Sequence, residues 1–98
     1  MRWVWDEEKN RSNRRDHKVS FEIAERVFDD PLAVTLPDPY QHEERWRTIG
    51  SPSTSSDVVL FVVHTWPEAD AAGDEVGRII SARKATRRER MTYEEGTF

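Results

Sequence analysis

The apolar positions of residues 21–30 (FEIAERVFDD) recur at the spacing of one helix face. They are Phe21, Ala24 and Phe28, with Ile23 and Val27 beside them. Ser20 precedes this stripe as a suitable N-cap, and Pro31 follows it where a helix has to end. The pattern predicts an amphipathic helix that packs on the core of the fold.

Residues 6–17 are polar throughout but carry the end signals of a helix. Asp6 is a suitable N-cap, two acidic residues follow it, and Arg14 and Arg15 fall in the last turn, which is the order that the helix dipole favours. A helix without an apolar stripe has to be held by polar contacts or by partners. Three of its side chains share one face at i, i+4 and i+8: Lys9, Asn13 and His17.

Short runs of apolar, aromatic and β-branched residues predict five strands. These are residues 2–5 (RWVW), 32–36 (LAVTL), 45–50 (RWRTIG), 58–66 (VVLFVVHTW) and 76–83 (VGRIISAR). The fourth run is apolar on both faces of the pleat, so it is predicted to be the central strand. Residues 51–57 and 67–75 are predicted loops. Thr86 and Glu89 form a T-x-x-E capping box, which predicts a last helix that ends near Glu95.

These elements run β-α-α-β-β-β-β-α over a single domain, residues 1–98. The order predicts an α+β fold: a small antiparallel sheet with two N-terminal helices and a C-terminal helix packed on it. The longest apolar run, residues 58–63, is too short to span a bilayer, and the first residues contain no apolar leader segment. A cytoplasmic protein without membrane contact is therefore expected.

The charges are separated along the chain, although the net charge is only -4. Five of the 15 Lys and Arg residues lie between Lys9 and Lys18 and five between Arg83 and Arg90, and each window holds a single acidic residue. The negative net charge argues against a general nucleic-acid binder, but a local cationic face can still bind an anion.

The sequence lacks the spacings of several kinds of catalytic site. Its histidines, His17, His42 and His64, show no H-x-x-x-H or H-E-x-x-H spacing, and cysteine is absent, so neither a metal nor a cofactor is expected. No P-loop, dinucleotide or serine-hydrolase motif is present. The kind of site that the sequence still supports is one built from arginines, because guanidinium groups hold phosphate through parallel hydrogen bonds. A phosphodiester can be cleaved without metal by a base, an acid and such cations.

The last strand and the last helix place candidate groups at one corner. In a regular strand Arg78 and Arg83 face opposite sides, unless the strand twists, bulges or ends before Arg83. We expect it to end there, with Arg83 beside the N-terminus of the last helix. Tyr93 either reaches a phosphate near this corner or locks the helix to the sheet. His64 is either a proton-transfer group or a packed imidazole, and the cations of residues 83–90 equally suit a solvated helix face or a partner-binding surface.

Four segments in this order resemble a known family. They are "WDEEKNRSNRRDHKVSFEIAERVFDD", "ERWRTIG", "VVHT" and "RIISARKATRRERMTYEEG", and they resemble the BrnT family of toxins from bacterial type II toxin-antitoxin systems over nearly the whole chain. The matched pattern positions are Lys9, Asn13, His17, Arg45, His64, Arg78, Ser81, Arg83, Glu89 and Tyr93. Two features depart from the family: Lys18 stands where glycine is usual, and the acidic loop of residues 67–74 is longer than expected.

The resemblance implies a RelE-like fold and a metal-independent ribonuclease that cleaves mRNA and blocks translation. It also implies that a BrnA-like antitoxin neutralises the toxin. In the complex of the two proteins, only the antitoxin is expected to contact operator DNA. We expect Arg83 and Arg78 to bind the phosphate and His64 or Tyr93 to transfer protons. The expected RNA contacts are Lys9, Asn13, His17, Arg45, Lys84 and Arg87, the first three being alternatively a structural clamp.

Two alternatives stay open at this point. The main one is a non-catalytic protein whose basic corner binds an acidic partner segment. A direct DNA-binding regulator has less support, because the sequence shows no helix-turn-helix pattern.

Overall fold

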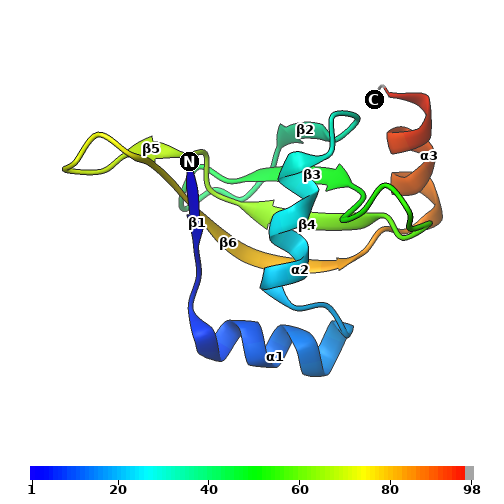
Figure 1. Cartoon of the computed structure of the whole chain (residues 1–98), viewed down its shortest axis with the longest axis horizontal. Helices are drawn as coiled ribbons and strands as arrows, with labels where there is room; N and C mark the ends of the chain where they lie inside the picture. Colours follow the sequence, from blue (N-terminus) through cyan, green and yellow to red (C-terminus); the bar gives the residue numbers. More distant parts are fainter. Residues whose placement is uncertain (97–98) are drawn as a thin grey trace.

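A computed structural model of the chain describes residues 1–96, and residues 97 and 98 of the predicted domain lie outside this range. Figure 1 shows a curved sheet with α2 across one face, α1 beside β6 and α3 at one end. The elements are β1 Arg2–Val4, α1 Glu7–His17, α2 Phe21–Glu25, η1 Arg26–Asp29, β2 Val34–Pro37, β3 Trp46–Gly50, β4 Leu60–His64, β5 Glu68–Ala69, β6 Glu75–Lys84 and α3 Arg87–Glu95.

The sheet in the described part of the chain has six strands, in the order β1-β6-β4-β3-β2, with β5 paired to the start of β6. The α+β prediction and the central place of β4 are confirmed. The sheet is mixed rather than antiparallel throughout, because β1 lies parallel to β6. These two strands are separated by most of the chain, so no hairpin fixes their relative direction. The predicted loop of residues 67–75 contains β5, which forms a projecting hairpin with β6.

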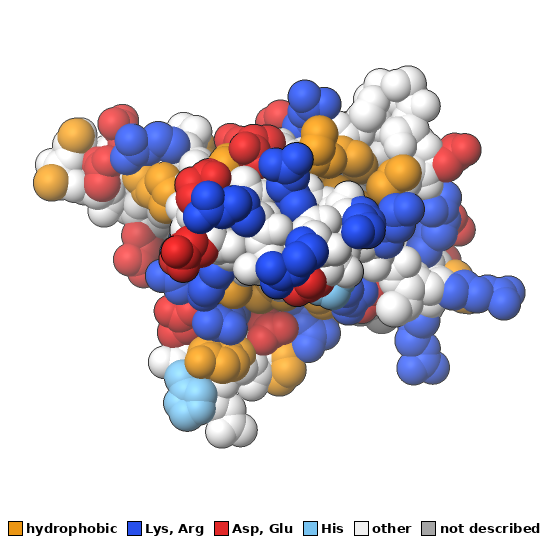
Figure 2. All heavy atoms as spheres, turned by 90° about the horizontal axis from the view of Figure 1, so that it is seen from below, with side chains coloured by type: hydrophobic (Ala, Val, Ile, Leu, Met, Phe, Trp, Pro, Cys, Tyr) orange, Lys and Arg blue, Asp and Glu red, His pale blue; other side chains and the backbone are white. Residues whose placement is uncertain are grey.

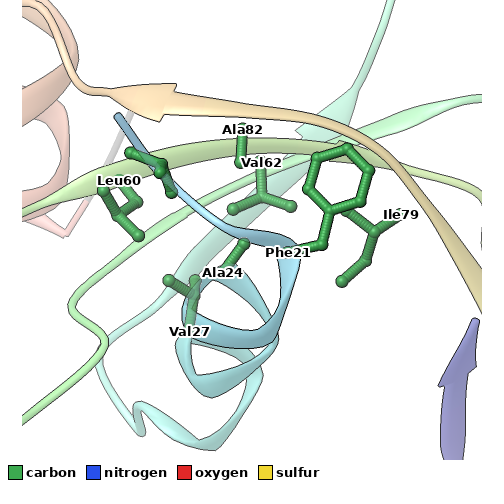
Figure 3. Packing of buried hydrophobic residues seen from close by; sticks show 8 residues of the cluster. Phe21, Ala24, Val27, Leu60, Val62, Ile79 and Ala82 are labelled. Carbon is green, nitrogen blue, oxygen red and sulfur yellow. The ribbon is translucent and has the colours of Figure 1, made fainter. Parts of the chain in front are cut away.

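The main core lies between α2 and the sheet (Figure 3). Its fully buried apolar side chains include Phe21, Ala24 and Val27 from α2 and η1, Leu60 and Val62 from β4, and Ile79 and Ala82 from β6. Burying a large apolar side chain contributes about 1.5–3 kcal/mol. Ile23, predicted to lie beside the buried stripe, is instead 37% exposed. The helix tightens into the 3-10 turn η1 after Glu25, and this turn directs Val27 into the core.

Helix α1 is attached by buried amides rather than by apolar packing. The Asn13 side chain donates to the carbonyls of Val19 (2.8 Å) and Ala82 (2.6 Å) and accepts from the Ala82 N–H (3.2 Å). Asn10, which the sequence interpretation did not single out, accepts from the Phe21 N–H at 2.8 Å. Because these bonds satisfy buried backbone groups, they fix α1 on β6 without an apolar stripe.

A bulge in β6 decides which side chains face away from the helices. Val63 lies opposite Ser81, but the next β4 residue, His64, lies opposite Ile79, so β6 carries one extra residue between them. As a result Ile79 and Ala82 both enter the helix-side core although they are three positions apart. The two arginines of β6, Arg78 and Arg83, therefore lie on the same face of the sheet, opposite α2. Tyr93 of α3 packs on one end of this face. A bulge was one of the exceptions that the sequence analysis allowed. The preferred expectation, that the strand ends before Arg83, is wrong, because β6 stays paired with β4 as far as Lys84.

Candidate nucleic-acid interface

The face of the sheet opposite α1 and α2 carries a row of arginines. Directly paired residues on neighbouring strands share a face, and the pairs are Ile49 with Phe61, Phe61 with Arg83, and Arg47 with Val63. Arg78 joins this face through the bulge, and Arg45 precedes Arg47 by two positions. We call this surface the arginine face, defined by Arg45, Arg47, Arg78 and Arg83.

Each arginine of this face is oriented by a carboxylate. Glu89 receives two hydrogen bonds from Arg83, at 2.7 and 2.9 Å, and Asp38 accepts from Nε of Arg47 at 2.8 Å. Glu43 bridges the other two, accepting from Nε of Arg45 (2.9 Å) and Nη2 of Arg78 (2.7 Å). In the recorded contacts of residues 1–96, Arg45 and Arg47 use only Nε, which keeps their Nη groups available for an incoming anion.

An aromatic ring lies between two of these guanidinium groups. The Arg83 guanidinium carbon is 4.2 Å from the centroid of the Phe61 ring, and that of Arg47 is 5.7 Å from it. Stacking on the ring and pairing with a carboxylate both restrict the Arg83 side chain, so its outer edge is preorganised. This part of the arginine face can receive a phosphate from the solvent side, because 36% of the Arg83 side chain is exposed.

The loop after β2 supplies further groups at the other end of the arginine face. The Arg45 guanidinium lies 3.7 Å from the centroid of the Tyr40 ring, and the exposed His42 packs edge-on against the same ring at 5.3 Å. An imidazole, a phenol and two guanidinium groups therefore meet where Glu43 bridges Arg45 and Arg78. This is the chemistry that proton transfer beside a phosphate requires.

The carboxylates on this face remain ionised at neutral pH. Burial by itself raises the pKa of Glu89, but hydrogen bonds from Arg83 and Thr86 outweigh burial and the pKa lies below its usual value. A hydrogen bond from Arg45, aided by Arg78, lowers the pKa of Glu43. The hydrogen bonds that Arg83 donates to Glu89 in turn raise the pKa of Arg83. A phosphate thus meets fixed, fully charged guanidinium groups.

His64 lies on the other side of the sheet, in the core. Its side chain is 2% exposed, bonds to Thr48 Oγ1 at 2.6 Å and to the Thr65 carbonyl at 2.8 Å, and contacts the rings of Trp3 and Phe28. Burial lowers its pKa below 6.5, so the imidazole is neutral at pH 7. The packed-imidazole interpretation therefore describes His64 better than the expectation that it transfers protons to or from RNA.

Tyr93 is likewise engaged in holding the fold together. Its hydroxyl donates to Asp30 at 2.7 Å, and its ring packs with the second core cluster, which contains Ile49, Val59 and Phe61. Burial and the Asp30 carboxylate raise the pKa of Tyr93 to about 12. The structure supports the interpretation that Tyr93 locks α3 to the sheet.

The remaining predicted RNA contacts do not lie on the arginine face. Lys9 and His17 are exposed on α1, across the sheet from it, while the buried Asn13 is the clamp described above. Lys84 lies opposite Leu60, on the helix side of the sheet. Arg87 is exposed in the first turn of α3. Of the predicted site residues, only Arg45, Arg78 and Arg83 are brought together.

The sequence analysis overlooked Arg47, Tyr40 and His42. The signal for Arg47 was present, because R-W-R in a predicted strand places Arg45 and Arg47 on one face. Tyr40 and His42 gave no such signal, since they lie in an irregular loop whose path is set by contacts with Arg45.

Two structural features are absent from residues 1–96. No group of three or more His, Cys, Asp or Glu side chains in this range is arranged to hold a metal ion. No helix among these residues combines the length and apolar character needed to cross a membrane.

The fold and the site define a class of protein: a small α+β protein with a row of oriented arginines that suits a phosphate-bearing ligand. Residues 5–89 match the family described as "Ribonuclease toxin, BrnT, of type II toxin-antitoxin system". The chain belongs to the BrnT family of ribonuclease toxins. This membership implies an RNA substrate and an antitoxin partner.

Among solved structures, the chain is similar to the 1.1 Å crystal structure of the Brucella abortus ribonuclease toxin, BrnT. The identity is 22% and the TM-score 0.57, and the match covers 89% of this chain and 99% of that one. This likeness shows a shared fold. No curated protein matches the chain.

Proposed function

We propose that this toxin cleaves messenger RNA without a metal ion and that a BrnA-like antitoxin neutralises it. The observation that carries the proposal is the presence of four arginines on one face of the sheet, opposite α2, each held in place by a carboxylate. Such a face binds the phosphates of a single strand while leaving the chain's net charge negative. The RelE-like classification belongs to the same proposal.

The arginines act on more than one phosphate. Arg78 and Arg83 are five residues apart on β6, which corresponds to roughly 15 Å along a strand. They therefore bind different phosphates of one RNA strand, with Arg47 beside Arg83 and Arg45 beside Arg78. The earlier expectation that Arg78 and Arg83 share a phosphate is replaced by this division.

Cleavage proceeds by attack of a ribose 2'-oxygen on the adjacent phosphorus. The 2'-hydroxyl proton passes to a base, the bond from phosphorus to the 5'-oxygen breaks, and that oxygen receives a proton. The products are a 2',3'-cyclic phosphate and a 5'-hydroxyl end. Guanidinium groups stabilise the charge that develops on the non-bridging oxygens, which is the role served elsewhere by metal ions.

Proton transfer is assigned to the loop end of the arginine face. His42 is exposed and contacts Tyr40, whose ring carries the Arg45 guanidinium. His64 and Tyr93 serve the fold instead, because their polar atoms are engaged by Thr48, Thr65 and Asp30.

In the cell, the toxin acts in the cytoplasm, where mRNA is accessible. The antitoxin blocks access of RNA to the arginine face, and contact with operator DNA is made by the antitoxin rather than by this chain.

The test compares RNA cleavage by the purified wild type with that by Arg83→Ala, Arg83→Lys and His42→Gln, in the presence of a chelator. We expect wild-type cleavage to persist, with cyclic-phosphate ends, and Arg83→Ala to lose about tenfold in kcat/KM, because a charge-assisted contact to a phosphate away from the cleaved one is removed. Arg83→Lys retains the charge but not the paired hydrogen bonds, so an intermediate rate is expected. His42→Gln should lower the cleavage rate, because the imidazole proposed to transfer a proton is removed.

Arg11→Ala is the matched control, since Arg11 is an exposed arginine on α1, across the sheet from the arginine face. Circular dichroism of each variant shows whether its overall helix content is unchanged. Loss of cleavage on chelation would refute metal independence. Growth arrest without new RNA ends would favour the non-catalytic alternative.

A further inference from the structure

A second cationic region lies on the helix side of the molecule, away from the arginine face. Figure 2, which looks at the molecule from the α1 side, shows Lys and Arg side chains gathered toward the end at which α3 lies. On this side of the molecule, Arg14 and Lys18 at the end of α1 and Lys84 of β6 line a hollow of about 570 Å³. The hollow is bounded by α1, the start of α2, the end of β6 and the loop before β4.

The hollow has an aliphatic floor and an exposed aliphatic rim. Leu60 and Val19 are buried at its base, while Ile23 and Val58 at its edges are 37% and 36% exposed. Among the described residues that line it, none is acidic and none is aromatic. Single-stranded RNA is usually held by aromatic rings on which bases stack, so this lining does not suit RNA. It suits an amphipathic peptide that offers both carboxylates and aliphatic side chains.

Lys18 occupies its position against local backbone preference. It caps α1 in the left-handed conformation, with φ of 61°, the only non-glycine residue with positive φ in residues 1–96. Glycine adopts this conformation without steric cost, whereas other residues are disfavoured. The lysine adds a cation to the rim of the hollow at a cost in backbone energy, and such strained positions tend to accompany function.

We infer that this hollow, lined by Arg14, Lys18 and Lys84 over Ile23, Val58 and Leu60, docks an acidic amphipathic segment of the antitoxin. The inference rests on the proposed neutralisation by the antitoxin and adds the surface at which the antitoxin is anchored. Three cations without a carboxylate neighbour in the lining complement an acidic segment, and the aliphatic rim provides the apolar contact area.

The position of the hollow connects anchoring to inhibition. Lys84 lines the hollow, while its neighbour Arg83 points to the other face. A segment anchored in the hollow reaches the arginine face by passing the β6–α3 corner. The surface that anchors the antitoxin is therefore adjacent to, but separate from, the arginine face that the antitoxin blocks. Mutations in the hollow can weaken antitoxin binding without changing RNA cleavage.

The experiment measures affinity for the purified antitoxin by calorimetry and RNA cleavage in parallel. Arg14→Glu and Ile23→Asp are each expected to weaken antitoxin binding about tenfold or more while RNA cleavage by the free toxin stays at the wild-type rate. Lys18→Gly is the sharpest variant. It relieves the left-handed backbone, so the melting temperature should rise while antitoxin binding falls.

Matched controls use the same chemistry outside the hollow. Arg11→Glu changes the same helix, and Leu32→Asp changes another exposed apolar residue, so neither should affect antitoxin binding. Unchanged binding in all three hollow variants would overturn the inference, as would a loss of RNA cleavage with antitoxin binding intact, which would make the hollow an RNA contact. If the wild type cleaved no RNA but the variants still lost the antitoxin, the proposed function would fail and the docking site would stand.

Discussion

Tyr93 and Asp30 join the last helix to the end of η1 through one hydrogen bond of 2.7 Å. Asp30 also accepts from the backbone N–H groups of Ser51 and Leu32, so a single carboxylate ties three segments together. The Tyr93 ring covers the apolar patch of Ile49 and Phe61 at the same time. A tyrosine near a cationic corner can have a catalytic or a structural role. The contacts of Tyr93 give it a structural role.

Tyr93 gives a prediction about alkaline stability. Its pKa is about 12 in the fold against 10.0 for an unperturbed tyrosine, because burial and Asp30 disfavour the phenolate. The resulting stabilisation is complete below pH 10 and is lost as the pH rises toward 12. Denaturant unfolding should show that the free energy of unfolding falls more steeply across this pH range for the wild type than for Tyr93→Phe. RNA cleavage by Tyr93→Phe at neutral pH should equal that of the wild type, and a large fall would instead assign a proton-transfer role to Tyr93.

Helix α1 illustrates at the element scale how a polar helix is held on a sheet. Its residues predict the helix and both of its ends, and Asp6 caps it as expected by accepting from the N–H groups of Glu8 and Lys9. The lack of an apolar stripe correctly predicts polar docking. The identity of the docking residues depends on β6, because Asn13 bonds to the backbone of Ala82, 69 positions away in the chain.

The docking of α1 can be tested through Asn13. Asn13→Ala leaves the Ala82 N–H and two carbonyls without a partner, each costing about 1–3 kcal/mol when the group stays buried. The free energy of unfolding should therefore fall substantially, and Asn13→Asp should be as harmful because a carboxylate cannot donate to the two carbonyls. Denaturant titration provides the measurement. Ser12→Ala is the control, since that hydroxyl bonds only within α1 in the described contacts, and an equal effect there would contradict the clamp.

The whole molecule separates two cationic surfaces on an acidic protein. The arginine face lies on the side of the sheet opposite α2, and the hollow lies on the α2 side, so RNA and a protein partner can be recognised by different chemistry. With a net charge of -4, long-range attraction of RNA is weak, and binding depends on local contacts. This arrangement limits non-specific binding while keeping phosphate recognition on one face.

Salt dependence tests this arrangement. If four arginines contact about four phosphates, the logarithm of the affinity for a non-cleavable single-stranded RNA should fall against the logarithm of salt concentration with a slope of about -3. Arg47→Gln should reduce the slope by about 0.7, the effect of one phosphate contact. Lys84→Gln, on the helix side, should leave it unchanged. Fluorescence anisotropy provides the data, and a larger effect of Lys84→Gln would move the RNA to the other face.

Much of the element structure could be read from the sequence because its signals are local. The capping box of Thr86 and Glu89 is present as predicted, and so are the caps at Asp6 and Ser20. The concentration of cations at the end of the last strand also follows from sequence alone. The direction of β1 could not be read in this way, because its partner lies more than 70 residues away and no turn connects them.

The sequence by itself determined which chemical groups this protein has, where its helices begin and end, and that its last strand runs into a cationic helix start. The tertiary structure decided which of those groups meet. A single extra residue in β6 brought Arg78 and Arg83 to one face, cross-strand pairing added Arg47, and burial removed His64 from the surface. The physical reason is that caps and periodicity act over a few residues, whereas register, bulges and burial depend on contacts between strands far apart in the chain.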